Sequence, residues 1–194
     1  MQLRVNYFIG SSLKYNKVQY CYGNEINKDF VYFIQKQLGI DASHEDYTKL
    51  EFSIPFDLII AINTLDHVPN PLIFLEKIHN DLSLKGLLYI EVPNDKQALN
   101  QYIPEPQKSS FSNFMYQKAH YYSFNFSTLE RFISENGFKI ISKINRHDYT
   151  LKNFLQWYFQ GPAESFFHHL DFAPTKQAVV YENTHHLVAN CLTQ

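Results

Sequence analysis

Polar side chains follow several apolar runs of the sequence, and their types suit the binding of a nucleoside. Glu25 follows one such run, and a carboxylate there can accept hydrogen bonds from both hydroxyls of a ribose. Asp46 and Tyr47 follow a second run and suit an exocyclic amine and stacking on a base. Asn63 and Leu65 come directly after a third. An acid after a strand is more often a turn former, so each residue alone leaves that alternative open.

A histidine within an aromatic segment is the candidate for proton transfer. The residues from Phe111 to Phe126 are rich in rings and include His120-Tyr121-Tyr122. Histidine is the side chain that moves protons near neutral pH, so His120 is the predicted catalytic base. Tyr121 and Tyr122 are then walls of an acceptor pocket. The alternative is that these rings only pack a lid onto the rest of the protein.

Two histidine pairs, His168-His169 and His185-His186, raise the question of a metal site. Adjacent residues of a strand point to opposite faces, and no Cys or Glu lies at ligand spacing beside either pair. We therefore expect surface or partly buried histidines and no metal. A serine hydrolase is also disfavoured, because the sequence contains no GxSxG elbow.

The elements that must position these residues are clearest between positions 56 and 94. Phe56–Ile62 is nearly all apolar, as in a strand buried on both faces of a parallel sheet. Asn70 and Pro71 suit the N-cap and the first turn of a helix. Leu87–Val92 then predicts a second strand. The apolar positions at helical spacing between the two strands are Leu72, Leu75, Ile78 and Leu82. The pattern is that of a βαβ unit.

The same alternation continues on both sides of this unit. Upstream, Val18–Tyr22 and Ile40–His44 are predicted strands around a helix that Asn27 caps and Gly39 closes. The expected apolar face of that helix consists of Phe30, Val31, Ile34 and Leu38. Downstream, the predictions are a capping box over Ser127–Glu130, a helix ending at Gly137, and strands over Phe138–Ile144 and His185–Cys191.

These elements predict one α/β domain over residues 1–194. Its expected architecture is a three-layer α/β/α sandwich with a mostly parallel, Rossmann-like sheet. Two long connections, at about 93–125 and 146–184, are expected to form a lid or substrate wall.

Composition excludes several other classes of protein. The chain has only six glycines, too dispersed for a GxGxxG or Walker loop. A formal net charge of −2 disfavours a nucleic-acid partner, and no apolar run approaches the 18 to 20 residues that span a bilayer. The sequence shows no signal peptide and has two cysteines near opposite ends. We therefore expect a reduced, cytoplasmic protein.

Taken together, these segments resemble the class I S-adenosylmethionine-dependent methyltransferases. The segment Phe56-Asp-Leu-Ile-Ile-Ala-Ile-Asn-Thr-Leu-Asp-His-Val-Pro-Asn-Pro-Leu is similar to the family motif FDxVxxxxVLEHVxDP.

The resemblance extends beyond that motif, in which Asp66 replaces the usual Glu. Leu84–Asn94 resembles the family's fifth strand, and Gly23-Asn-Glu25 resembles the end of its second. Phe126–Phe138 is similar to the helix and sixth strand. The later residues Asn153, Trp157 and Gly161-Pro162 are similar to the tail of members encoded among surface-glycan genes. The resemblance covers roughly residues 20–165.

The resemblance implies a role for each candidate of the cofactor site. Glu25 would hold the ribose of S-adenosylmethionine and Asp46 the adenine amine, with Tyr47 beside it. Asn63 and Leu65 would line the methionine and adenosine side of the pocket.

The family's first motif, a glycine-rich turn of the form DxGxGxG, is incomplete in this sequence. The only candidate is Val5–Ser12, where Phe8 stands in place of the acid and Ser12 in place of the second glycine. Gly10 is the one expected cofactor contact from this turn. The chain is therefore expected to be a shortened methyltransferase or one with a degenerate cofactor site.

The leading prediction is methyl transfer from S-adenosylmethionine to a small-molecule or carbohydrate-like (glycan) acceptor, at oxygen, with His120 as base. The Asp66-His67 pair is expected to brace its loop, and a catalytic His67 is the less favoured alternative. The alternative function is a degenerate module that binds no cofactor and acts by binding a partner. A nicotinamide dehydrogenase is disfavoured because the glycine turn for a pyrophosphate is missing. We expect no nucleic-acid or membrane partner and leave a homodimer open.

Overall fold

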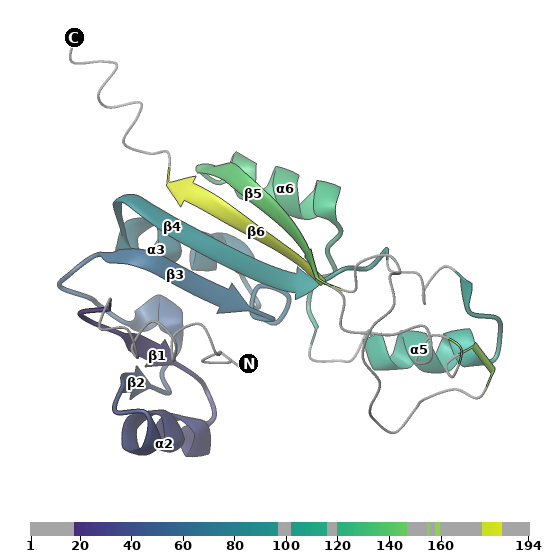
Figure 1. The fold of residues 1–194 in the computed structure, drawn as a ribbon, viewed down its shortest axis with the longest axis horizontal. Coiled ribbons are helices and arrows are strands. Elements are labelled where there is room, and N and C mark those ends of the chain that lie inside the picture. Colours follow the sequence, from purple (N-terminus) through teal and green to yellow (C-terminus); the bar gives the residue numbers. More distant parts are fainter. Residues whose placement is uncertain are drawn as a thin grey trace, which may run out of the picture.

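The computed structural model describes residues 18–96, 102–115, 120–146, 155, 158–159 and 176–183. Its central feature is a four-stranded sheet in the order β3-β4-β6-β5 (Figure 1). β3 (Phe56–Ile62) and β4 (Leu82–Pro93) are parallel. β6 (Lys176–Asn183) is antiparallel to β4 and to β5 (Phe138–Arg146). β3, β4 and β5 therefore share one direction, and β6 runs opposite to them.

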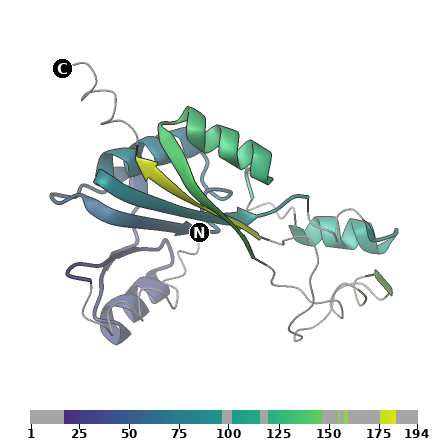
Figure 2. The same ribbon diagram turned by 45° about the horizontal axis from the view of Figure 1, so that its top comes forward.

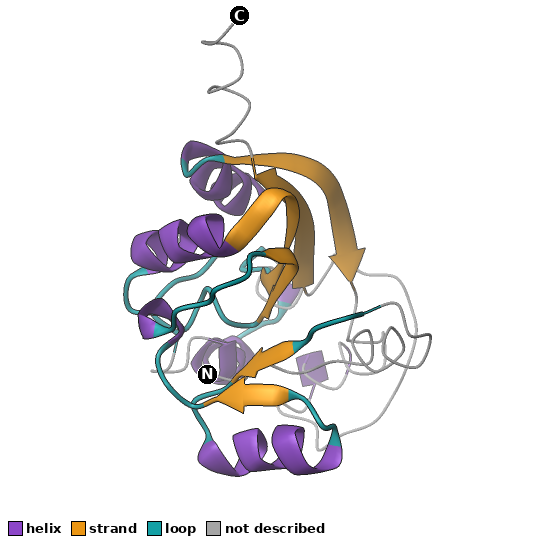
Figure 3. Cartoon of the chain, turned by 90° about the vertical axis from the view of Figure 1, so that its left-hand side faces the viewer, coloured by secondary structure: helices purple, strands orange, loops and turns teal. Residues whose placement is uncertain are grey.

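A second, parallel pair of strands forms the N-terminal part of the described chain. β1 (Tyr22–Asn24) pairs with β2 (Asp41–Ser43), and Asn24 lies opposite Ser43. The helix α2 (Lys28–Gln37) connects the two strands and lies against them (Figure 3). The predicted α/β fold is thus confirmed, with a parallel pair of strands in each sheet.

The main core lies between the four-stranded sheet and two helices on one of its faces (Figure 3). These helices are α3 (Pro71–Asp81) and α6 (Phe126–Glu135). Alternate residues of a strand point to the same side, so β4 presents every second side chain to the helices. The central contacts come from Leu75, Ile78, Leu88, Ile90, Val92, Leu129 and Ile133.

The start of α3 agrees with the prediction, whereas its buried face differs by one position. The Asn70 side chain accepts a hydrogen bond from the Ile73 N–H at 3.3 Å, and Pro71 occupies the first turn. Leu72 is exposed, and Phe74 is buried in its place. Buried positions 71, 74, 75 and 78 follow the i, i+3, i+4, i+7 pattern of a helix face. The predicted face begins at Leu72, one residue after the first buried position.

The N-terminal elements are shorter and more exposed than predicted. The sequence suggests a strand over Val18–Tyr22, but β1 begins only at Tyr22. Asn27 caps α2 as expected by accepting a hydrogen bond from the Asp29 N–H at 2.9 Å. Phe30 and Leu38 are exposed, because only the positions that face the small β1-β2 pair are covered.

Two C-terminal predictions also need correction. The capping box of α6 is formed by Asn125 and Thr128, two residues before the predicted start at Ser127. The strand β6 was not predicted at all. The strand predicted over His185–Cys191 lies outside the described residues.

The predicted lid at 93–125 contains the helix α5 (Gln107–Met115). Figures 1 and 2 place α5 beyond the carboxyl ends of β3 and β4. In the part of the chain that the structure describes, no helix is both long and apolar enough to cross a membrane.

Gly86 is expected to tolerate no side chain. A Cβ built there would lie 2.9 Å from the Phe56 carbonyl oxygen and 3.0 Å from the Ser83 nitrogen, both backbone atoms. Gly86→Ala should therefore lower the free energy of unfolding by about 1–3 kcal/mol, as measured by urea denaturation. The neighbouring exposed residue gives a control, since Lys85→Ala should change stability by less than about 0.5 kcal/mol. Equal stability of the two variants would contradict the steric argument.

Candidate cofactor and acceptor site

The carboxyl ends of β1 and β2 are tied together by hydrogen bonds. The Asn24 side-chain amide donates to the carbonyls of Ser43 at 3.2 Å and Glu45 at 2.8 Å. The Glu25 N–H also donates to the Ser43 carbonyl, at 3.0 Å. Parallel strands bring their carboxyl ends to one edge, and ligands of open α/β sheets bind at that edge. Glu25 and the loop after β2 therefore lie where a nucleoside is expected.

Glu25 is held in one orientation at this edge. The residue is only 2% exposed, and its Oε1 accepts a hydrogen bond from the Asn27 N–H at 3.0 Å. This contact links the carboxylate to the start of α2. A carboxylate can accept several hydrogen bonds, so the same group retains capacity for the two hydroxyls of a ribose.

The two residues predicted for the adenine lie in different environments. Asp46 is exposed and caps a short 3-10 helix, η1 (Tyr47–Lys49), by accepting from the Thr48 N–H at 3.0 Å. Tyr47 is buried in the core, with its ring against Phe74. Its stacking role stays a prediction that this placement does not favour.

The Tyr47 hydroxyl is part of a buried polar contact. It donates to Asp81 Oδ2 at 2.6 Å, and Lys77 Nζ donates to the same oxygen at 2.7 Å. Lys77 Nζ also lies 5.5 Å from the centre of the Tyr47 ring. Burial and the neighbouring Asp81 carboxylate both raise the pKa of Tyr47.

Tyr47→Phe should lower the free energy of unfolding by about 1.5–3 kcal/mol at pH 7, the usual worth of a hydrogen bond to a charged group. The folded state favours the neutral phenol, so the Tyr47 hydroxyl contributes its full stabilisation below about pH 10 and less as the pH rises further. The difference in free energy of unfolding between wild type and Tyr47→Phe should therefore be smaller at pH 11 than at pH 7, as measured by urea denaturation. Tyr32→Phe, at an exposed ring, is the control. A difference that is larger at pH 11 would refute this explanation.

The loop after β3 begins with a residue in an uncommon conformation. Asn63 has φ +48°, in the left-handed region that asparagine tolerates better than most residues. Its N–H donates to the Glu91 carbonyl at 2.7 Å. Its side-chain Oδ1 is buried and has no hydrogen-bond partner within the described part of the chain. Leu65 is fully buried in the core, and its predicted contact with the cofactor stays a prediction.

Two side chains of this loop, Asp66 and His67, lie close to His120 from a distant segment. His67 Nε2 lies 3.6 Å from Asp66 Oδ2, and His120 Nε2 lies 3.7 Å from the same oxygen. The two imidazole rings are 4.4 Å apart between their centres. Sequence reasoning treated the Asp66-His67 pair and His120 separately, and the structure brings them together.

Backbone hydrogen bonds hold the His120 segment against this loop. The N–H groups of Tyr121 and Tyr122 both donate to the Asp66 carbonyl, at 2.8 and 3.3 Å. The Tyr122 hydroxyl donates to the Pro69 carbonyl at 3.2 Å. His120 therefore has a defined position relative to Asp66.

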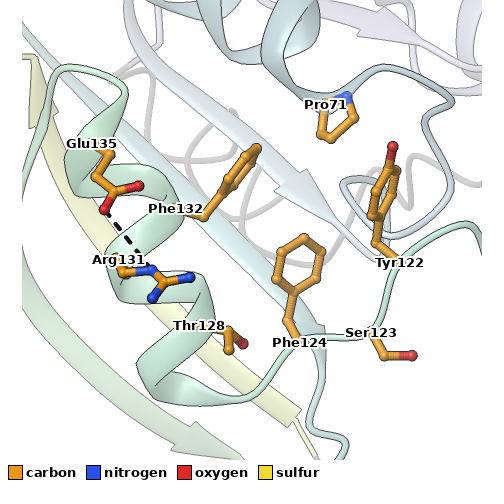
Figure 4. A pocket seen from close by; sticks show the side chains of 8 residues that line it. All are labelled: Pro71, Tyr122, Ser123, Phe124, Thr128, Arg131, Phe132 and Glu135. Atoms are coloured by element: carbon orange, nitrogen blue, oxygen red, sulfur yellow. Dashed lines mark ion pairs between the residues drawn. The ribbon is translucent and has the colours of Figure 1, made fainter.

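A small pocket of about 260 Å³ lies next to the same segment, between α6 and the start of α3. The side chains of Tyr122, Phe124, Phe132 and Pro71 surround its apolar part (Figure 4). Arg131 and Glu135 form an ion pair of 3.9 Å on the α6 side. The remaining lining residues are Ser123 and Thr128.

The predicted cofactor residue Gly10 lies outside the described residues. Both histidine pairs, His168-His169 and His185-His186, for which no metal is expected, are also outside them. Asn153, Trp157 and Gly161-Pro162 lie outside as well.

The described residues fit the cofactor that the resemblance implies. Buried polar atoms in proteins normally have a hydrogen-bond partner. The buried Asn63 Oδ1 can obtain one from a donor group on a bound ligand. Glu25 would hold the ribose hydroxyls, and Asp46 is accessible to an amine. When bound, S-adenosylmethionine supplies an activated methyl group.

Comparison with known proteins also points to a methyltransferase. A model of the family described as methyltransferase domain matches residues 13–143. Pavine N-methyltransferase from Thalictrum flavum subsp. glaucum is 28% identical over 92 residues, which cover 46% of this chain. The chain spans about a quarter of that relative, 26% of its length.

Two solved structures have the same fold. The S-adenosylmethionine-dependent methyltransferase from Mesorhizobium loti has a TM-score of 0.61 and 12% identity, covering 91% of this chain and 86% of that chain. N-methyltransferase NodS from Bradyrhizobium japonicum WM9, in complex with S-adenosylhomocysteine, has a TM-score of 0.57 and 8% identity, with coverages of 89% and 71%. The chain therefore belongs to the methyltransferase domain family.

Proposed function

We propose that this chain transfers the methyl group of S-adenosylmethionine to a nitrogen atom of a small-molecule amine, with His120 as the general base. The observation that carries the proposal is the position of His120, whose Nε2 lies 3.7 Å from Asp66 Oδ2 beyond the end of β3. A base at this edge can reach an acceptor placed in line with the donor.

Nitrogen replaces the oxygen acceptor expected from the sequence. Two of the similar proteins, pavine N-methyltransferase and NodS, are named as N-methyltransferases. Both similarities are distant, so they support the choice of nitrogen without identifying the amine. Carbohydrate-like amines belong to the same chemical class and are included in the test.

The proposed step is a direct displacement. The acceptor nitrogen forms a bond to the methyl carbon while the carbon–sulfur bond breaks, and its electron pair stays on sulfur. His120 Nε2 accepts the proton that the nitrogen loses. Asp66 Oδ2 lies 3.7 Å from this nitrogen, so the carboxylate stands beside the proton that His120 receives.

The test combines cofactor binding with product analysis. Titration calorimetry should detect binding of S-adenosylhomocysteine, and incubation with methyl-labelled S-adenosylmethionine should label amines in a panel of small amines, amino sugars and matched alcohols. Labelling of alcohols alone would replace nitrogen by oxygen. The absence of heat at millimolar ligand would favour the module that binds no cofactor.

A further inference from the structure

The Asp66, His67 and His120 side chains have the composition of a metal site. Their ligand atoms, one carboxylate oxygen and two imidazole nitrogens, all lie within 4.8 Å of one another. The Asp66 Oδ2 distances of 3.6 and 3.7 Å to the two Nε2 atoms exceed hydrogen-bond length. Donors about 2.0–2.2 Å from a tetrahedral metal are roughly 3.3 Å apart, which is close to these separations.

Charge also favours a cation between these groups. The Asp66 side chain is 3% exposed, and buried carboxylates in proteins are paired or coordinate metals. A divalent ion held by this carboxylate and the two imidazole nitrogens would supply the positive charge at this point.

The site is held in place on one side and open on the other. The His67 N–H donates to the Thr64 carbonyl at 2.9 Å, and the Tyr121 N–H fixes the His120 segment to Asp66. The side chains of His67 and His120 remain 21% and 20% exposed. Three protein ligands with an open side are typical of catalytic metal sites.

We infer that Asp66, His67 and His120 bind one divalent transition-metal ion. Two imidazoles favour Zn²⁺ and its neighbours over Mg²⁺ or Ca²⁺. This departs from the sequence expectation of no metal, which considered only the adjacent histidine pairs. What the ion does rests on the proposed function: a bound ion occupies the Nε2 lone pair of His120, so His120 acts as the base only in the metal-free chain, and Zn²⁺ at this site inhibits methyl transfer.

Calorimetry of the metal-stripped full chain with Zn²⁺ tests the site directly. We expect one ion per chain with a Kd of about 1 μM or tighter. His67→Ala and His120→Ala should each weaken binding by about 100-fold or more, since even outer-shell changes cost 10–100-fold. Asp66→Asn, which nearly keeps the shape of the side chain, should also weaken Zn²⁺ binding. The d–d absorption bands of bound Co²⁺ should also change in His67→Gln.

The controls separate this site from other histidines and from the proposed function. The double variant His168→Ala/His169→Ala and the exposed His44→Ala should bind Zn²⁺ as the wild type does. No saturable binding, or binding that persists in a His67→Ala/His120→Ala variant, would overturn the site. S-adenosylhomocysteine binding is measured in the same samples. Its absence together with intact Zn²⁺ binding would refute the proposed function and leave the metal site standing.

Discussion

Replacing His120 by alanine is expected to lower kcat for methyl transfer by about 100- to 10,000-fold, the range of general acid–base catalysis. The Kd for S-adenosylhomocysteine should stay unchanged, because His120 lies beside Asp66 and not beside Glu25 at the end of β1. Steady-state kinetics with an identified acceptor and calorimetry measure the two quantities.

Tyr32→Phe is the control for that experiment. Its side chain is exposed on α2 and has no part in the candidate site. A kcat of His120→Ala equal to that of the wild type would show that His120 is not the base. A fall in kcat accompanied by a large fall in melting temperature would instead indicate a structural role.

Replacing Glu25 by alanine is expected to raise the Kd for S-adenosylhomocysteine by about 10- to 100-fold. Each hydrogen bond to a charged group contributes about 1.5–3 kcal/mol, and 1.4 kcal/mol corresponds to a tenfold change in Kd. Glu25→Gln should have a smaller effect, since its carbonyl oxygen can still accept from the Asn27 N–H. Calorimetry gives both values.

The control for Glu25 is Glu45→Ala, an exposed acid at the neighbouring strand end. Its Kd should equal that of the wild type. If both variants bind equally well, the ribose is held elsewhere. Melting temperatures of the free variants show whether loss of the Asn27 contact alone explains a weaker Kd.

Local signals account for the elements that the sequence predicted well. β3 coincides with its apolar run, and Asn70 with Pro71 fixed the start of α3. Both depend on residues close together in the chain. β6 depends on pairing with β4 and β5 on either side, and its own residues, Lys176–Asn183, carry only a short apolar stretch.

The candidate site shows the same limit. The sequence identified Glu25, Asp46, Asn63 and His120 as candidates from their places after strands and in an aromatic segment. It could not show that Tyr47 would bond to Asp81, 34 residues away, and so belong to the core. Nor could it bring His120 beside His67, because that contact depends on backbone bonds between distant segments.

The attachment of the His120 segment through backbone N–H groups has a consequence for sequence divergence. Every residue except proline has the N–H groups with which Tyr121 and Tyr122 contact Asp66. Side chains at these two positions can therefore vary among relatives while the histidine keeps its place. Such a site can acquire new acceptor preferences by exchanging the residues beside the base, without rebuilding the base itself.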